Sequence, residues 1–398
     1  MTARLAAQER ASGTAAILVV MPSQTDGDPH GVAPTRIVIG LPLITRIVLA
    51  ATAAGYEVLV HGIDADAWRV LRGTAAVRLA ASSDAAPRRR SRIVVLPANV
   101  IPQPRWLERL RDIPLDRGKI YVDEEMAVVI DSERPEAVLA MVAAATSAPA
   151  LTAAMRRVYE AVVLRPDDRG RFRLAAAADA PRAQRWLLRS LIKQNEGFMS
   201  RHLERPISLA LTRQLARTSI SPNAMTLVSV AIGLAGAPFF LSPSPPHQTV
   251  GALLFLTHSI LDGCDGELAR LKFLRSRLGA VLDFWGDNVV HVAVFTAMAI
   301  GWTLDIGAMW PLALGALASA GTLGSAAVMF RHTAADEAIA AGATPAARLA
   351  GRLAHRDFIY VVLLASLFGK ASWFLAVAAV GTPAFLLLAL WLDRVRAR

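Results

Sequence analysis

The chain has 398 residues, 54% of them hydrophobic, and a formal net charge of +11 at pH 7. Its mean hydropathy of +0.41 is too high for an ordinary soluble protein and too low for a chain that lies in a membrane throughout, so we expect a soluble part joined to a membrane part. The charge indicates nucleic acid or an anionic membrane surface as a partner. Zinc-ligand spacings and interleaved aromatic and basic residues are absent from the sequence, which favours the membrane over nucleic acid.

Short β-branched segments alternate with helical segments from residue 14 to about residue 165. This order predicts an α/β domain with a largely parallel sheet over residues 1–180. The predicted strands are residues 17–20, 56–60, 92–96 and 127–130, and the predicted helices are residues 43–54, 106–111 and 135–145. The first residues lack a basic stretch that leads into a long apolar run, so we expect no cleaved signal peptide. The basic run at residues 88–92 is expected to be a solvated loop.

Residues 181–220 form a predicted linker between this domain and an apolar C-terminal region. Within the linker, residues 209–215 with Arg213 and Arg217 have the pattern of an amphipathic helix that lies at a membrane surface.

Six apolar segments follow, and we expect an all-α bundle of six transmembrane helices over residues 221–398. The predicted spans are residues 222–241, 248–269, 279–302, 308–330, 355–369 and 372–392. Basic residues collect on one side of these spans, which predicts an inner-membrane protein with a cytoplasmic N-terminal domain and C-terminus. Small residues in the fourth span, such as Gly315 and Gly321, predict close packing within the bundle or in a homodimer.

Four aspartates lie where the second span ends and the third begins, in the pattern D-x2-D-G-x2-A-R-x8-G-x3-D-x3-D. Asp262 and Asp265 share one face of a helix, and so do Asp283 and Asp287. A charged side chain in hydrocarbon costs at least a few kcal/mol, so such groups normally face a polar cavity and have a function. Their convergence predicts a site for one or two divalent cations such as Mg²⁺. The alternative is a set of polar residues on a solvated helix face.

This pattern resembles the signature of the CDP-alcohol phosphotransferase (CDP-alcohol phosphatidyltransferase) superfamily at every fixed position. The resemblance implies a membrane enzyme that moves a phospho-alcohol or phosphatidyl group from a CDP-alcohol to an alcohol acceptor and releases CMP, in phospholipid or polyol-phosphate synthesis. It implies Asp262, Asp265 and Asp283 as ligands of two Mg²⁺ or Mn²⁺ ions, with Asp287 as both ligand and general base.

The same resemblance implies a set of substrate-binding residues. Contact with the nucleotide is expected from Gly266, Arg270 and Ser276, and room for the cytidine from Ala269 and Gly279. Asn223 and Thr226 match the family's entry to the first span and are expected to border the site. By its position, Arg277 is a candidate for a phosphate on the acceptor, with a membrane anchor as the alternative. His258 and His291 lie within predicted spans and are expected to be core residues.

Residues 40–46, 54–56 and 95–99 resemble sugar-phosphate nucleotidyltransferases. The loop at residues 22–31 lacks that family's phosphate-binding signature, and Asn99 stands near the place of its metal-binding aspartate. Without these groups we expect an inactive, degenerate domain with a structural, regulatory or docking role.

The linker at residues 181–220 resembles the segment that joins the two halves in fused nucleotidyltransferase/di-inositol-phosphate phosphate synthase-like proteins. Two alternatives stay open. One is a catalytically silent membrane anchor that presents the cytoplasmic domain to a partner. The other is a bifunctional enzyme that also makes the CDP-alcohol.

Overall fold

The computed structural model describes residues 15–23, 32–79, 90–123, 126–164, 170–192, 198–336 and 358–396. The chain divides into two compact units, Met1–Arg189 and Ser190–Arg398. The predicted boundaries at residues 180 and 220 stay a prediction.

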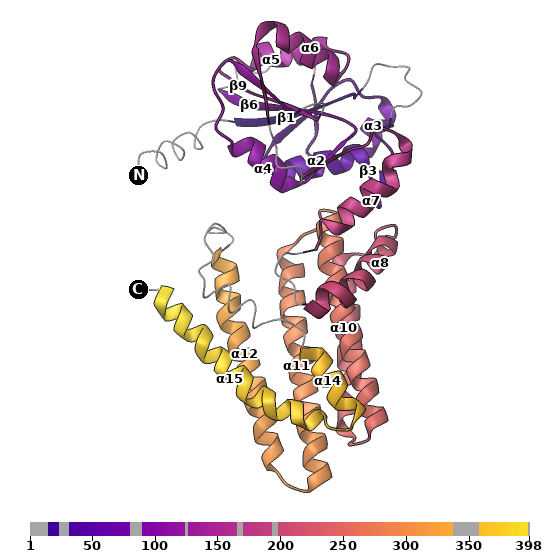
Figure 1. The fold of residues 1–398 in the computed structure, drawn as a ribbon, viewed down its shortest axis with the longest axis vertical. Helices are drawn as coiled ribbons and strands as arrows, with labels where there is room; N and C mark the ends of the chain where they lie inside the picture. Colours follow the sequence, from indigo (N-terminus) through magenta and orange to yellow (C-terminus); the bar gives the residue numbers. More distant parts are fainter. Residues whose placement is uncertain are drawn as a thin grey trace. The chain divides into compact units, whose positions relative to one another are not determined.

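The first unit is built on a seven-stranded sheet (Figure 1). Its strand order is β10 (Glu160–Val163), β8 (Lys119–Asp123), β9 (Ala127–Ser132), β6 (Ser91–Pro97), β1 (Ala15–Met21), β4 (Glu57–Val60) and β5 (Val77–Arg78). All neighbours pair in parallel except β9, which is antiparallel to both β6 and β8. Only three residues separate β8 from β9, too few for the crossover that parallel neighbours need. The predicted, mostly parallel sheet is therefore confirmed, with β9 as the exception.

Helices cover both faces of this sheet, with α5 and α6 on one face and α2 and α4 on the other (Figure 1). The helices are α2 (Leu43–Ala53), α3 (Ala65–Val70), α4 (Pro104–Asp112), α5 (Pro135–Ala144), α6 (Ala148–Val158) and α7 (Ala180–Arg189). Two small antiparallel pairs, β2 (Ile37–Val38) with β3 (Leu41–Pro42) and β7 (Val100–Pro102) with β11 (Arg171–Arg173), complete the unit. The core on the first face joins alternate residues of β1, such as Ile17 and Val19, to Val138 and Leu151.

The expected solvated loop at residues 88–92 is wrong for Arg92, which lies in β6 and is 8% exposed. Its Nε donates to Asp131 Oδ1 at 2.7 Å and its Nη2 to Asp131 Oδ2 at 2.9 Å. The acidic partner comes from β9, far along the chain, so the local run of arginines gave no sign of this buried pair.

Asn99 has a structural role in the first unit. Its Nδ2 donates to the backbone oxygen of Leu174 at 2.9 Å, and Leu174 N donates back to Asn99 O at 2.9 Å. The Asn99 side chain therefore secures the segment after β11. Residues 24–31 of the preceding predicted loop lie outside the described residues.

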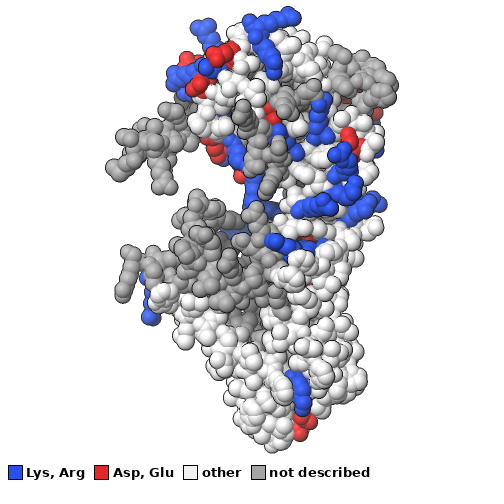
Figure 2. All heavy atoms as spheres, viewed as in Figure 1, with Lys and Arg blue, Asp and Glu red and all other residues white. Residues whose placement is uncertain are grey.

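The second unit is helical. After a π-helical turn, η2 (Ser200–Glu204), come α8 (Arg205–Leu215), α9 (Pro222–Gly236) with its continuation η3 (Ala237–Leu241), α10 (Pro245–Leu271), α11 (Arg277–Ile306), α12 (Trp310–Asp336), α14 (Phe358–Leu367) and α15 (Ala371–Arg396). Among the described residues, four segments are long and apolar enough to cross a membrane: residues 222–241, 277–306, 310–330 and 371–391. These are four of the six predicted spans. Much of the helical surface drawn in Figure 2 carries few charged side chains, as contact with lipid requires.

The other two predicted spans are α10 and α14. α10 has sufficient length, 27 residues, but its polar and acidic side chains lower its mean hydropathy. α14 is described over ten residues, and residues 337–357 before it lie outside the described part of the chain. The total of six spans stays a prediction.

The small residues of α12 pack inside this unit. A Cβ added to Gly315 would lie 2.5 Å from the Cβ of Ala299, and one added to Gly321 would lie 2.6 Å from the backbone nitrogen of Pro383. These glycines therefore allow α12 to approach α11 and α15 closely. The predicted packing within the bundle is confirmed, and the homodimer stays a prediction.

Candidate active site

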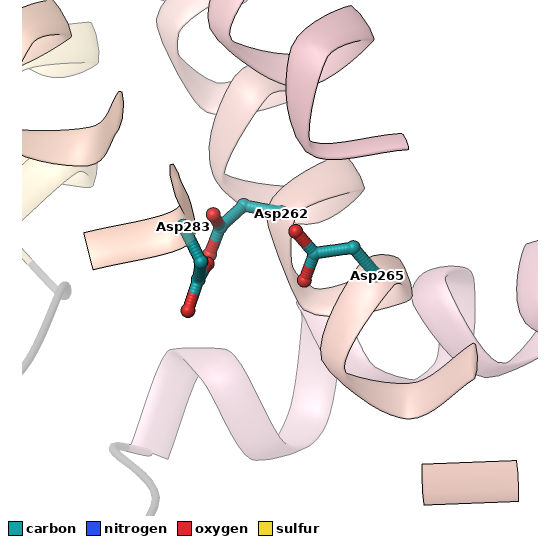
Figure 3. A group of neighbouring side chains, drawn as sticks. All are labelled: Asp262, Asp265 and Asp283. Carbon is teal, nitrogen blue, oxygen red and sulfur yellow. The ribbon is translucent and has the colours of Figure 1, made fainter. Parts of the chain in front are cut away.

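Three aspartates from two helices converge in the second unit. Asp262 and Asp265 lie on α10 and Asp283 lies on α11, and one carboxylate oxygen from each is within 4.8 Å of the others. Figure 3 shows Asp262 and Asp265 leaving the same helix toward the side chain of Asp283. Asp262 is 5% exposed and Asp265 is 4% exposed. The helical spacing of the motif thus brings three of the four predicted ligands together.

A hydroxyl group from a third helix holds Asp265. Thr226 on α9 is buried and donates a short hydrogen bond from its Oγ1 to Asp265 Oδ2. Ser221 caps the N-terminus of α9, because its Oγ accepts from Ala224 N at 3.2 Å, and Thr226 lies in the first turns of this helix.

The fourth aspartate, Asp287, lies one helical turn after Asp283 on α11, where it meets His258 of α10. Its Oδ1 is 3.3 Å from His258 Nε2, and His258 Nδ1 is 3.0 Å from the backbone oxygen of Ser229. His258 is 2% exposed, so the prediction of a core histidine is correct but incomplete. Its position four residues before Asp262, on the same helix face, was the available signal in the sequence.

A cavity of about 700 Å³ opens onto the carboxylates of Asp265 and Asp283. All eight residues predicted to bind substrate line it: Asn223, Thr226, Gly266, Ala269, Arg270, Ser276, Arg277 and Gly279. The sequence did not single out the apolar part of the wall, to which Val281, Phe284 and Phe330 belong. The rings of Phe284 and Phe330 lie 5.5 Å apart. The cavity therefore combines an acidic end, basic side chains and an apolar wall.

Two glycines leave space at the cavity. A Cβ added to Gly279 would lie 2.7 Å from Asn223 Oδ1 and 3.0 Å from Ser276 Oγ, and one added to Gly266 would lie 3.3 Å from Arg270 Nη1. Ser276 also caps α11, because its Oγ accepts from Gly279 N at 3.0 Å. A side chain at either glycine would crowd groups that line the cavity.

The donor set fits a hard divalent cation. Carboxylate oxygens are the ligands that Mg²⁺ prefers, and oxygens bound to one Mg²⁺ at about 2.1 Å lie about 3 to 4 Å apart. The 4.8 Å limit on the three carboxylate oxygens is close to that spacing. Three carboxylates around one space repel one another, and a bound cation or a retained proton offsets that repulsion.

Residues 219–392 match the model of the CDP-alcohol phosphatidyltransferase family. The C-terminal half of the chain is therefore a CDP-alcohol phosphatidyltransferase domain. A relative named bifunctional IPC transferase and DIPP synthase, from Rubrobacter xylanophilus, is 35% identical over 204 residues, which are 51% of this chain and 44% of that protein. The protein of the same name from Thermococcus kodakarensis is 37% identical over 119 residues, which are 30% of this chain and 26% of that protein.

The chain thus matches less than half of the length of these two curated relatives.

A crystal structure of the phosphatidylinositol phosphate synthase of Mycobacterium tuberculosis with CDP-DAG bound aligns with 47% of this chain and 94% of that chain. The identity is 22% and the TM-score 0.34.

Proposed function

We propose that this chain is an integral membrane transferase that moves a phospho-alcohol or phosphatidyl group from a CDP-alcohol to an alcohol acceptor and releases CMP. The observation that carries the proposal is the group of three aspartates at the end of a cavity lined by all eight predicted substrate-binding residues. A silent membrane anchor has no use for acidic groups that are costly to bury in a membrane.

The aspartates would hold the cation that the reaction needs. When bound, the divalent cations, which we propose to be two Mg²⁺ or Mn²⁺ ions, would neutralise the diphosphate of the donor and the charge that develops on the leaving CMP. Asp262, Asp265 and Asp283 would supply the principal ligands. The hydrogen bond from Thr226 would keep the Asp265 carboxylate turned toward the cavity.

Asp287 is our candidate for the general base and for a further ligand. The acceptor hydroxyl must lose a proton as its oxygen attacks phosphorus, and a carboxylate within hydrogen-bond reach can take that proton. His258 Nε2 lies 3.3 Å from Asp287 Oδ1, and this contact would orient the carboxylate.

The remaining lining residues would bind the substrates. Contact with the nucleotide is assigned to Gly266, Arg270 and Ser276, and Ala269 and Gly279 leave room for the cytidine. Asn223 and Thr226 border that site. Arg277 would bind a phosphate on the acceptor, since a guanidinium forms paired hydrogen bonds with phosphate oxygens. Glycerol phosphate, inositol phosphate and related polyols are the candidate acceptors.

We further propose that the chain is a homodimer in the inner membrane, with its N-terminal domain and C-terminus in the cytoplasm. The basic residues of the predicted connections support this orientation by the positive-inside rule. The site would then be open to a water-soluble nucleotide. The N-terminal domain would be inactive, since Asn99 offers an amide, bonded to Leu174, where a metal-binding carboxylate is needed.

The test is CMP release by purified protein in detergent with Mg²⁺ and labelled CDP-diacylglycerol, offered glycerol phosphate or inositol phosphate. Asp265→Asn should abolish release, and Asp305→Asn, which changes an exposed aspartate at the other end of α11, should not. Mass spectrometry of the product identifies the acceptor. Undiminished release by Asp265→Asn would refute the mechanism.

Two further outcomes would favour the alternatives. No release from any donor, together with a stable complex with another protein, would favour a membrane anchor. CTP-dependent pyrophosphate release by the full chain would indicate a bifunctional enzyme.

A further inference from the structure

A third acidic side chain on α10, Glu267, is buried away from the cavity. Glu267 is 0% exposed, and three donors from α8 hold its carboxylate. Arg205 Nη1 lies 2.6 Å from Glu267 Oε1, Ser208 Oγ donates to the same oxygen at 2.7 Å, and Thr212 Oγ1 donates to Oε2 at 2.7 Å. These four side chains are called the α8 latch below.

The latch holds α10 on the side opposite to the aspartates. At 3.6 residues per turn, Glu267 points roughly 140° away from Asp262 and roughly 160° away from Asp265. One helix thus carries carboxylates on two opposite faces. A rotation of α10 that loosened the latch would also turn Asp262 and Asp265.

Small residues within the aspartate motif leave space for the α8 latch. Gly263, the residue after the first aspartate, lies beneath the guanidinium of Arg205, and a Cβ there would be 3.1 Å from Nη1. The neighbouring Cys264 donates from Sγ to the backbone oxygen of Ser208 at 3.5 Å. Both positions are variable in the family-like pattern, so their small side chains are explained by the approach of α8.

A second contact ties the start of α8 to the bundle. The hydroxyl of Tyr360 on α14 donates to Glu204 Oε1 at 3.1 Å, and Glu204 directly precedes Arg205. The first turn of α8 is therefore held from α10 and from α14.

We propose that Glu267 is a positioning residue for the candidate site. Through α8 it fixes the rotation of α10, and with it the direction of the Asp262 and Asp265 carboxylates. The inference rests on the proposed function only for its catalytic consequence, because the placement of the cation ligands can be measured without turnover. Removing one partner of a buried charge pair leaves an uncompensated charge and is far more disruptive than replacing both partners by apolar residues.

Cys264 provides a built-in reporter of the latch. It is the chain's single cysteine, it is 0% exposed, and it lies under Ser208 of α8. If α8 separates from α10, the thiol becomes accessible to a maleimide. The rate of labelling therefore measures how often α8 separates from α10. The affinity for Mn²⁺, followed by electron paramagnetic resonance, reports whether the aspartates keep their positions as cation ligands.

The experiment compares the full-length protein in detergent with Glu267→Ala, the double variant Arg205→Met/Glu267→Met, and Asp305→Asn as the control. We expect Glu267→Ala to speed labelling at least 10-fold and to weaken Mn²⁺ binding by about 10- to 100-fold, the usual effect of removing a group that orients metal ligands. The double variant should recover much of both, and the control should change neither.

Faster labelling with unchanged Mn²⁺ binding would overturn the proposal, because the latch would then have only a structural role. Weaker Mn²⁺ binding with unchanged labelling would overturn it as well, because Glu267 would not act through α8. If Glu267→Ala does not fold, Thr212→Val and Ser208→Ala each remove one donor and should shift both measurements together by a few-fold; no shift in either would refute the latch. Absence of CMP release by the unaltered protein would count against the proposed function and leave these two measurements standing.

Discussion

His258 Nε2 lies 3.3 Å from Asp287 Oδ1, and the other nitrogen of the same ring lies 3.0 Å from the backbone oxygen of Ser229. One buried imidazole on α10 thus connects α9 to the aspartate of α11 that we assign as general base. The packing leaves little freedom for the ring, because a Cβ on Gly233 would be 3.0 Å from His258 Cγ.

His258 should therefore orient Asp287. We expect His258→Phe, which keeps an aromatic ring and loses both nitrogens, to lower kcat for CMP release by about 10- to 100-fold with little change in KM for the donor. His258→Gln, which keeps a side-chain donor, should retain more activity. The exposed His247 at the far end of α10 provides the control, His247→Phe. Full kcat in His258→Phe would contradict this role.

The hydrogen bond from Thr226 should matter for the cation site. Thr226→Val keeps the shape of the side chain and removes the donor to Asp265. We expect the Mg²⁺ concentration for half-maximal CMP release to rise about 10-fold, because a metal ligand that loses its orienting partner binds less well. The matched control is Thr257→Val, since the hydroxyl of the exposed Thr257 donates to the backbone oxygen of Leu253 on its own helix. Equal Mg²⁺ dependence of the two variants would argue against the role of Thr226.

Gly279→Ala should narrow the cavity. The added methyl group would lie 2.7 Å from Asn223 Oδ1, and such crowding typically costs about 1–3 kcal/mol. We expect KM for the CDP-alcohol to rise roughly 10-fold or more, measured by CMP release at varied donor concentration. A Cβ at Gly381 on α15 meets no atom within 4 Å, so Gly381→Ala should leave KM unchanged. A normal KM in Gly279→Ala would show that the nucleotide does not need this space.

The pair of Arg92 and Asp131 should stabilise the first unit. Both side chains are buried, and Asp131→Asn would leave the Arg92 guanidinium without its charged partner. The free energy of unfolding should fall by about 3–5 kcal/mol. Glu133→Gln, which removes the exposed ion pair with Arg117, should change it by less than about 1 kcal/mol. Thermal unfolding of the full chain in detergent measures both, and equal transitions would disprove the difference.

Much of the candidate site was readable from the sequence because helical periodicity is local. Aspartates spaced by three or four residues must share a helix face, and apolar flanks indicate where those helices lie, so the meeting of Asp262, Asp265 and Asp283 followed from spacing and family resemblance. The family resemblance, rather than periodicity, predicted the cavity lining from Asn223 to Gly279, except for Arg277, which was a candidate by its position. In the first unit, runs of β-branched residues identified β1, β4, β6 and β9.

Only the tertiary structure decided which distant side chains meet. The short connection between β8 and β9 makes β9 antiparallel. The resulting register places Asp131 of β9 directly opposite Arg92 of the neighbouring strand β6. In the sequence, Glu267 occupies a variable position of the motif and His258 is expected to be a core histidine. Only the packing of α8 and α11 against α10 shows that Glu267 bonds Thr212 and that His258 meets Asp287. Spacing along one helix determines which residues share a face, whereas the partners of that face depend on how separate helices pack together.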